Sequence, residues 1–322
     1  MVHIRLFDLR DVSAVQRLSA FGRALAYEPI AGDGLNPLRE AMRAYVSAGY
    51  DNTIALIRRD TSNKDQDTFG LMTLIPSRNQ DRPQYASMLY MTPVPHTDDH
   101  VVAWSEITEV FVTMAIEHRA HCIVAEANAT SLEAEALRRA GFSHLVNQDI
   151  MKLGALPLEM ESIEVPGLRR QIERDDLLIH LLGMRVVPKL VQMAEGNTDL
   201  TRLTHRMDCG FVLMRNQEPL ANISLRQGRR GHVMQVLFRS EAEDVVEPVI
   251  TYSLAHLCDR TRRPVYCIVP SYQSWILPTL DKLGFTHITS NSIMVRHTTA
   301  RVRQPVWAVQ TSRANAKLIK TK

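Results

Sequence analysis

The pattern of apolar and polar positions occurs twice along this 322-residue chain, once in each half. The first half begins with a strand-like run at 2–11. Two helical runs then follow in the first half, and two corresponding helical runs stand near the start of the second half. Three short runs then follow in each half, rich in β-branched and aromatic residues or with alternating polarity, and both features predict strands. The helical runs are 12–21 and 37–47, then 175–184 and 187–196. The predicted strands are 52–60, 68–77 and 85–94 in the first half and 210–216, 219–227 and 232–240 in the second.

After its third predicted strand, each half continues with a helix, a strand, a second helix and a last strand. In the first half the helices cover 101–120 and 131–142 around a strand at 121–127. In the second half they cover 245–263 and 272–285 around a strand at 264–271. Strands that alternate with helices in this way predict an α/β fold.

The repeat is clearest where the last helix of each half meets the last strand. The chain reads GFSHLVNQDIM from Gly141 and GFTHITSNSIM from Gly284. Each glycine is placed to end a helix at positive φ, and Phe142 or Phe285 can then pack back on the last turn. We infer a duplicated domain. The predicted units are an N-terminal domain at 1–153, a linker at 154–165, a C-terminal domain at 166–300 and a basic tail at 301–322.

Composition and charge narrow the functional classes. The chain is 45% apolar and 23% charged, as in ordinary soluble proteins. The net charge of +3 gives no reason to expect a nucleic-acid partner. We find no apolar run of about 18 residues and no secretory signal, so we expect a cytoplasmic protein without a membrane partner. The four cysteines form no CxxC pair, and the tail is expected to be a solvated extension.

The residues Arg-Arg-Ala-Gly-Phe at 138–142 and Asp-Lys-Leu-Gly-Phe at 281–285 close a helix in the same element order. In both respects the chain resembles the GNAT superfamily of acyl-CoA-dependent N-acyltransferases. The resemblance implies an α/β fold of two tandem GNAT-like domains, each a mixed, mostly antiparallel sheet flanked by helices. It also implies transfer of an acetyl or other acyl group from acyl-CoA to a small-molecule or peptide amine.

In that family the sheet splays between its fourth and fifth strands, and acyl-CoA lies in the gap. The pyrophosphate binds at the start of the next helix, where glycines let it approach the free N–H groups. The corresponding segments of this chain contain no glycine and several carboxylates. These are Asp98 and Asp99 in the first half, and Glu241, Glu243 and Asp244 in the second. We expect these carboxylates to cap the helix starts and to repel a diphosphate.

The resemblance also suggests candidate site residues. The family's frequent tyrosine acid is replaced by Leu137 and Leu280, which leaves Tyr272 as a displaced candidate for the catalytic acid. Gln273 occupies the polar position at the start of the last helix, and Arg239 lies near the helix start after the preceding strand. Both are candidate cofactor-binding residues. They favour the second half as the active one.

A general base in the family often comes from a glutamate on the fourth strand. The corresponding strands offer Gln235 in the second half and only Tyr85 and Tyr90 in the first. Two hypotheses therefore stay open. The chain is an N-acyltransferase, or it is a catalytically degenerate tandem domain that binds a ligand or a partner.

Other motifs have structural interpretations. His96 and His100 stand at a helix start that contains a proline, so we predict no metal site. The segment GRRGH at 228–232 lies between two predicted strands and favours a hairpin turn. His144 and His287 recur at the same place in both copies, which predicts a shared structural role.

Overall fold

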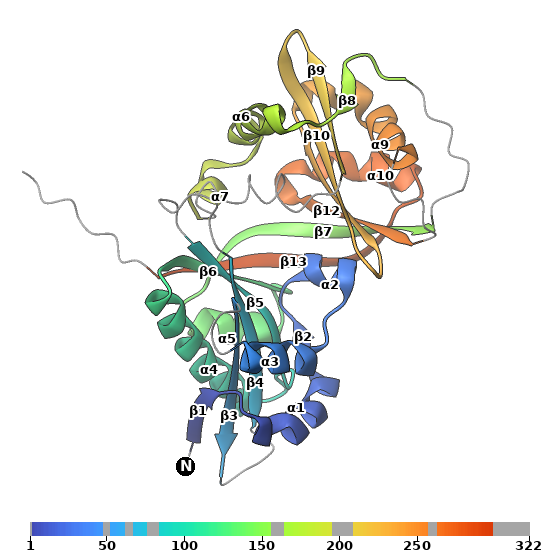
Figure 1. Ribbon diagram of the computed structural model, residues 1–322. Coiled ribbons are helices and arrows are strands. Elements are labelled where there is room, and N and C mark those ends of the chain that lie inside the picture. The colour runs from blue at the N-terminus through green and yellow to red at the C-terminus, as the bar shows by residue number, and fades with distance from the viewer. Residues whose placement is uncertain are drawn as a thin grey trace, which may run out of the picture.

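The computed structural model describes residues 2–47, 52–61, 67–75, 84–155, 164–194, 209–256 and 263–298. These residues form one 13-stranded sheet with helices on both faces (Figure 1). The strands of the N-terminal half are β1 (Val2–Leu6), β2 (Arg23–Ala24), β3 (Thr53–Asp60), β4 (Thr68–Ile75), β5 (Gln84–Thr92), β6 (Ala120–Ala127) and β7 (Ser143–Ala155). Its helices are α1 (Val12–Leu18), α2 (Tyr27–Asp33), α3 (Pro37–Val46), α4 (Asp98–Glu117) and α5 (Leu132–Arg139).

The C-terminal half repeats much of this order. Its strands are β8 (Leu168–Arg170), β9 (Cys209–Arg215), β10 (Glu218–Gln227), β11 (His232–Phe238), β12 (Pro264–Pro270) and β13 (Thr286–His297). Its α-helices are α6 (Asp176–Val186), α7 (Lys189–Ala194), α9 (Val246–Ala255) and α10 (Leu277–Lys282). Two 3-10 helices, η5 (Ser240–Val245) and η6 (Ser271–Ile276), precede α9 and α10.

The pairing confirms a mixed, mostly antiparallel sheet in each half. β3, β4 and β5 are antiparallel neighbours, whereas β5 and β6 are parallel. The same holds for β9, β10 and β11, followed by the parallel pair of β11 and β12. The predicted hairpin turn joins β10 to β11, with the Gly228 N–H donating to the Gly231 carbonyl at 3.1 Å.

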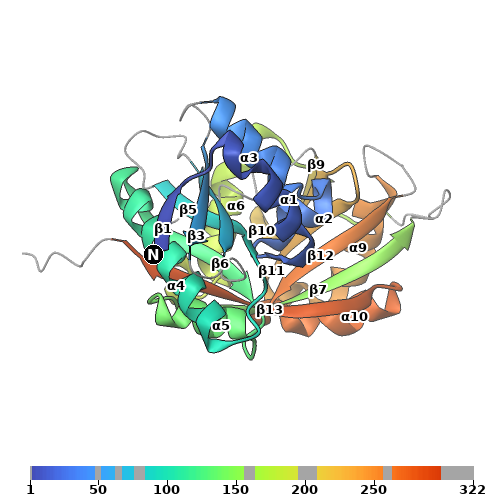
Figure 2. The same cartoon turned by 90° about the horizontal axis from the view of Figure 1, so that it is seen from below.

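The last strands of the two halves are exchanged, which the sequence analysis did not predict. β13 from the C-terminal half pairs with β6 of the N-terminal half, and β7 pairs with β12 of the C-terminal half. β7 and β13 also pair with each other, antiparallel, at the centre of the sheet. Figure 2 shows them side by side, with α5 of one half and α10 of the other nearby. Each half therefore depends on a strand from the other to continue its sheet.

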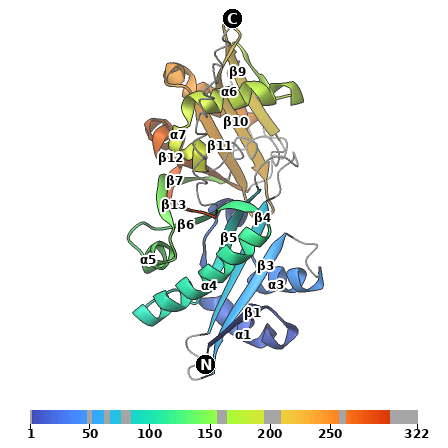
Figure 3. The ribbon, with the colours of Figure 1, turned by 90° about the vertical axis from the view of Figure 1, so that its left-hand side faces the viewer.

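Helices cover the N-terminal strands on two faces, because successive side chains of a strand point to opposite sides. Leu56 and Met72 face the cluster that contains Trp104 of α4. Ile57 and Leu71 face the cluster formed with α1 and α3. Figure 3 shows α4 and α3 on opposite sides of these strands. In the C-terminal half, α9 packs in one core with β9–β12, and α6 contacts β10 and β11.

The repeated GF phrases end helices as predicted. The Phe142 N–H donates to the Leu137 carbonyl at 3.0 Å, and the Phe285 N–H donates to the Leu280 carbonyl at the same distance. Gly141 and Gly284 have φ values of 79° and 85°, in the left-handed region where glycine carries no Cβ penalty. These are Schellman ends, and both phenylalanines are buried.

Some predicted boundaries differ from the structure. The helix expected at 272–285 divides into η6 and the six-residue α10. The helix expected to begin at 101 begins at Asp98. β2 and α2 were not predicted, because they comprise only 2 and 7 residues and have no clear periodicity. The basic tail at 301–322 lies outside the described residues.

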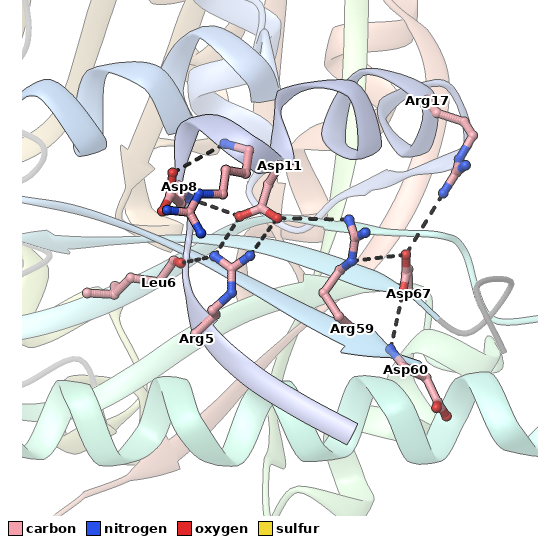
Figure 4. Close-up of polar contacts among 9 residues, drawn as sticks. Arg5, Leu6, Asp8, Asp11, Arg17, Arg59, Asp60 and Asp67 are labelled. Atoms are coloured by element: carbon pink, nitrogen blue, oxygen red, sulfur yellow. Dashed lines mark hydrogen bonds and ion pairs between the residues drawn. The ribbon is translucent and has the colours of Figure 1, made fainter. Parts of the chain in front are cut away.

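A second repeated feature fixes the turn after the first strand of each half. Arg5 donates two hydrogen bonds to the buried Asp11 at 2.7 and 2.8 Å, and the Asp8 N–H donates a third at 3.0 Å (Figure 4). Arg169 donates twice to the buried Asp175 at 2.6 Å. Figure 4 also shows Asp67, which forms ion pairs with Arg59 and Arg17. Bidentate guanidinium–carboxylate pairs are among the strong polar contacts of proteins.

These contacts predict an acid-sensitive part of the stability. Arg169 holds the pKa of Asp175 below its ordinary value of 3.8. The stabilisation is therefore present above about pH 4 and is lost as the pH falls through the lowered pKa. We expect Asp175→Asn to lower the free energy of unfolding at pH 7 by about 1–3 kcal/mol. The variant should also lose less stability than wild type between pH 5 and pH 2.

Urea unfolding followed across this pH range checks the prediction. Glu173→Gln is the matched control, because Glu173 is exposed in the same turn. Equal acid sensitivity in wild type and Asp175→Asn would rule out this role of the carboxylate.

Candidate functional site

The N-terminal half has a strand gap between β5 and β6, and the chain itself fills it. The two parallel strands pair as far as Ser87 and Val124. Beyond that point, the Leu25 N–H donates to the Leu89 carbonyl at 2.9 Å, and the Glu126 N–H donates to the Leu25 carbonyl at 2.8 Å. Leu25 is fully buried. Main-chain atoms of the segment after β2 therefore bridge the two strands where they separate.

The C-terminal half has the corresponding gap between β11 and β12. These strands pair as far as Gln235 and Ile268. Beyond them, the side chain of Gln273 accepts from the Phe238 N–H and donates to the Phe238 carbonyl, both at 3.0 Å. Here a single side chain bridges the end of the gap. The Gln273 side chain can leave the gap by rotating about its side-chain bonds. The Leu25 bridge consists of main-chain atoms, so it can leave only if the backbone itself moves.

A cavity of about 780 Å³ lies between the halves. Strands near the centre of the sheet contribute Val124, Val146 and Ile293 to its wall, and α2, α3 and α7 contribute further lining residues. On the C-terminal side it is lined by both sides of the β11–β12 gap, through Val236, Leu237, Pro270 and Tyr272. On the N-terminal side it is lined by Leu25, Leu89 and Glu126 at the filled gap.

The structure places the three predicted site residues near this gap but gives them different contacts. Tyr272 lines the cavity and is half-buried. Gln273 is buried and engaged with Phe238. Arg239 donates to Glu218 and to Glu241, both at 2.7 Å, and these contacts keep the pKa of its guanidinium raised. Gln273 and Arg239 are therefore held by contacts inside their own half.

At the start of α4 the N-cap contact comes from a threonine and not from an aspartate. The Thr97 side chain caps α4 by accepting from the His100 N–H at 3.4 Å. Asp98 is 88% exposed and lies 3.8 Å from Arg139. Threonine reaches the N–H groups because it occupies the N-cap position, one residue before the helix.

At the second helix start, Glu241 pairs with Arg239, and Asp244 pairs with Arg215 at 3.3 Å. η5 has no side-chain cap at its N-cap residue. The N-cap side chain of the first helix start is thus Thr97, and at the second helix start the N-cap residue makes no such contact. The carboxylates nevertheless leave both helix starts acidic, which opposes the binding of a diphosphate there.

Sequence reasoning missed the polar group that joins the halves at the cavity. Glu28 of α2 accepts from Gln235 Nε2 at 3.2 Å, and its other oxygen lies 3.4 Å from Arg226 Nε. Arg226 also pairs with Asp33 at 3.2 Å and donates to the Glu28 carbonyl at 2.7 Å. No local signal predicts these contacts, because Glu28 and Gln235 lie 207 positions apart.

A second carboxylate fixes the start of α2. Glu126 accepts from the Tyr27 N–H at 3.1 Å and from Gln148 Nε2 at 2.7 Å. Burial, with further contributions from Tyr266 and Glu126, raises the pKa of Tyr27 to about 12. Glu126 therefore anchors the segment that fills the N-terminal gap, through its own N–H and through its side chain.

The described residues show neither a metal-binding cluster nor a helix suited to a membrane. No group of three or more His, Cys, Asp or Glu side chains is arranged to hold a metal ion there. Within the same ranges, no helix is long and apolar enough to cross a membrane. The repeated histidines make local contacts: His144 Nε2 lies 2.9 Å from Asn147 Oδ1, and His287 Nε2 lies 2.9 Å from Ser290 Oγ.

Comparison with known proteins tests the fold. No protein-family model matches the chain, and no curated protein matches it. Among solved structures, a GCN5-related N-acetyltransferase from Sphaerobacter thermophilus has a TM-score of 0.55 at 12% identity, covering 93% of this chain and 96% of the other. A tandem GNAT protein from the clavulanic acid biosynthesis pathway has a TM-score of 0.51 at 13% identity, covering 93% and 99%.

A third solved structure, a Drosophila protein, has a TM-score of 0.52 at 12% identity and covers 92% of this chain and 99% of its own. At these identities the likeness concerns the fold and leaves the activity open. The alignments extend through both halves, in agreement with the duplicated element order. The chain therefore has a tandem GNAT-like fold.

Proposed function

We propose that the protein is an acyl-CoA-dependent N-acyltransferase in which only the C-terminal half holds the acyl-CoA. The observation that carries this proposal is the asymmetry of the two strand gaps. Main-chain atoms of Leu25 fill the N-terminal gap. The C-terminal gap is bridged by one carboxamide and opens on the cavity between the halves.

The residues of the C-terminal gap fit the pantetheine arm of acyl-CoA in one respect. That arm carries amide groups, which offer the same donor and acceptor as the Gln273 carboxamide. Because the C=O and N–H of a trans amide point apart, two amides of the arm, one accepting and one donating, would replace the single carboxamide at the Phe238 N–H and carbonyl. The acidic start of η5 fits the pyrophosphate poorly, so we assign no phosphate contact to Arg239. Tyr272 remains the candidate for the catalytic acid, because it lines the cavity beside the gap.

The second candidate function is ligand binding in the cavity without catalysis. The bridge between Gln273 and Phe238 favours it, since a closed gap requires no cofactor. The two functions differ in one measurable property, the affinity of the protein for acetyl-CoA.

Calorimetric titration with acetyl-CoA tests the proposal through Gln273→Ala. The substitution leaves the Phe238 N–H and carbonyl without their partner in the free protein, while the two incoming amides would satisfy them. We expect Gln273→Ala to bind acetyl-CoA about tenfold more tightly than wild type, which corresponds to roughly 1.4 kcal/mol.

Gln192→Ala is the matched control, because Gln192 lines the cavity but bonds to the carbonyls of Met184 and Val187. Its affinity should equal that of wild type. If neither wild type nor Gln273→Ala binds at millimolar acetyl-CoA, the acyltransferase proposal fails and ligand binding without catalysis replaces it.

A further inference from the structure

We infer that Glu28, which the N-terminal half contributes, receives the proton of the amine acceptor at a reaction centre formed with the C-terminal half. This inference rests on the proposed acyltransferase function. It assigns the two halves separate tasks: the C-terminal half supplies the strand gap, and the N-terminal half supplies the carboxylate that faces it.

The described residues around the cavity include arginines from both halves, Arg39 and Arg43 in one and Arg226 and Arg229 in the other, but carboxylates from one half alone. Among the described residues that line it, every carboxylate comes from the N-terminal half, and the C-terminal half contributes none. These carboxylates are Glu28, Asp33, Glu40 and Glu126. An alkyl amine arrives at neutral pH as an ammonium cation, and a carboxylate beside it can bind the cation and accept the proton that the nitrogen must lose before it attacks. In this cavity that group has to come from the N-terminal half.

Position singles out Glu28 among the four. Gln235, its hydrogen-bond partner, is the last residue of β11 that pairs with β12, so this contact marks the point where the strands separate. Asp33 also pairs with Arg226, as Glu28 does, but is 48% exposed, and Glu40 pairs with Arg39 and Arg43. Glu126 is engaged with the start of α2. Glu28 is 20% exposed, close to the 17% of Glu40, so its contact with Gln235 beside the gap is what distinguishes it.

Close packing of α2 on the C-terminal half holds this carboxylate in place. The Arg230 N–H donates to the Gly32 carbonyl at 2.7 Å. A Cβ on Gly228 would lie 2.3 Å from the Gly32 main chain, so only glycine permits this approach. Figure 1 shows α2 at the boundary between the halves. The helix is part of the N-terminal half in sequence, yet it forms one wall of the C-terminal gap.

The reaction balances with Glu28 as the proton acceptor. One proton passes from the ammonium group to the Glu28 carboxylate, and the neutral nitrogen attacks the thioester carbonyl carbon. The C–N bond forms, the C–S bond breaks, and the second proton of the attacking nitrogen ends on the leaving thiolate. Glu28 then releases its proton to solvent. The products are the amide, free CoA and one proton.

The test compares Glu28→Gln with Asp33→Asn in the full chain. Both substitutions remove one carboxylate that pairs with Arg226, so a purely structural role predicts similar effects. The acceptor probe is n-butylamine, and acetyl-CoA is the acyl donor. We expect Glu28→Gln to keep the wild-type affinity for acetyl-CoA and to lose butylamine-dependent CoA release by about 100-fold, and Asp33→Asn to stay within about threefold of wild type.

A binding measurement supplies a readout that does not depend on turnover. In the CoA-loaded protein, wild type and Asp33→Asn should prefer n-butylammonium over n-butanol, and Glu28→Gln should lose this preference. Absence of acetyl-CoA binding in every variant would sink the proposed function. Binding with unchanged CoA release in Glu28→Gln would overturn only the role of Glu28. The role of Glu28 would also be overturned if wild type bound acetyl-CoA but showed neither butylamine-dependent CoA release nor a preference for n-butylammonium.

Discussion

A chain that ends at residue 285, just before β13, is expected to lose cooperative folding. β13 lies between β6 and β7 at the centre of the sheet, and it pairs with β7 over residues 286–295 and with β6 over residues 292–297. Its loss leaves a gap between the two halves and exposes two strand edges that invite aggregation. It also removes the buried side chains of Met294 and Val295 from two different cores. We expect no cooperative thermal transition by circular dichroism and poor dispersion in the amide NMR spectrum.

The matched control is a chain that ends at residue 298, which retains β13 and every contact described above. It should unfold cooperatively, close to the full-length chain. A chain ending at 285 that melts cooperatively within a few degrees of this control would show that the exchanged strand is dispensable, and the interdependence of the halves would have to be abandoned.

Trp104→Ala is expected to lower the free energy of unfolding by about 3–5 kcal/mol. Trp104 is fully buried on α4 within the larger core of the N-terminal half, and its indole Nε1 donates to the Pro93 carbonyl at 2.7 Å. The substitution leaves a cavity and removes the donor of that carbonyl at the same time. Chemical unfolding of both proteins at pH 7 measures the difference.

Val102→Ala provides the comparison on the same helix, because Val102 is 44% exposed. Surface substitutions of this kind usually change stability by less than about 0.5 kcal/mol. A loss below about 1 kcal/mol for Trp104→Ala would mean that α4 is not packed as described.

The sequence predicted the features that depend on neighbouring residues. Gly141 and Phe142 act within one helix turn, so their pattern alone indicated the helix end that the structure confirms. The three consecutive strands of each half follow from apolar patterning and short connections. The sequence predicted the acidic first turn of α4, but it did not predict Thr97 as the cap, because Asp98 directly after it is an equally suitable N-cap residue.

Features that depend on distant partners were not predictable in this way. β13 carries the same kind of pattern whether it pairs within its own half or with β6, so the exchange leaves no local signal. The segment around Leu25 is too short to read as a strand, although it fills the N-terminal gap. Glu28 lies in an unremarkable helix, and only folding brings it to Gln235. The sequence favoured the second half as the active one through Gln273 and Arg239, which stays a prediction, and it gave no indication of Glu28.

The number of acetyl-CoA molecules bound per chain tests the central claim most directly. Calorimetric titration of the wild-type protein gives this number without knowledge of the amine substrate. Because Leu25 fills the N-terminal gap with main-chain atoms and the C-terminal gap opens on the cavity, we predict one molecule per chain. Two molecules per chain, or none at millimolar acetyl-CoA, would contradict the account.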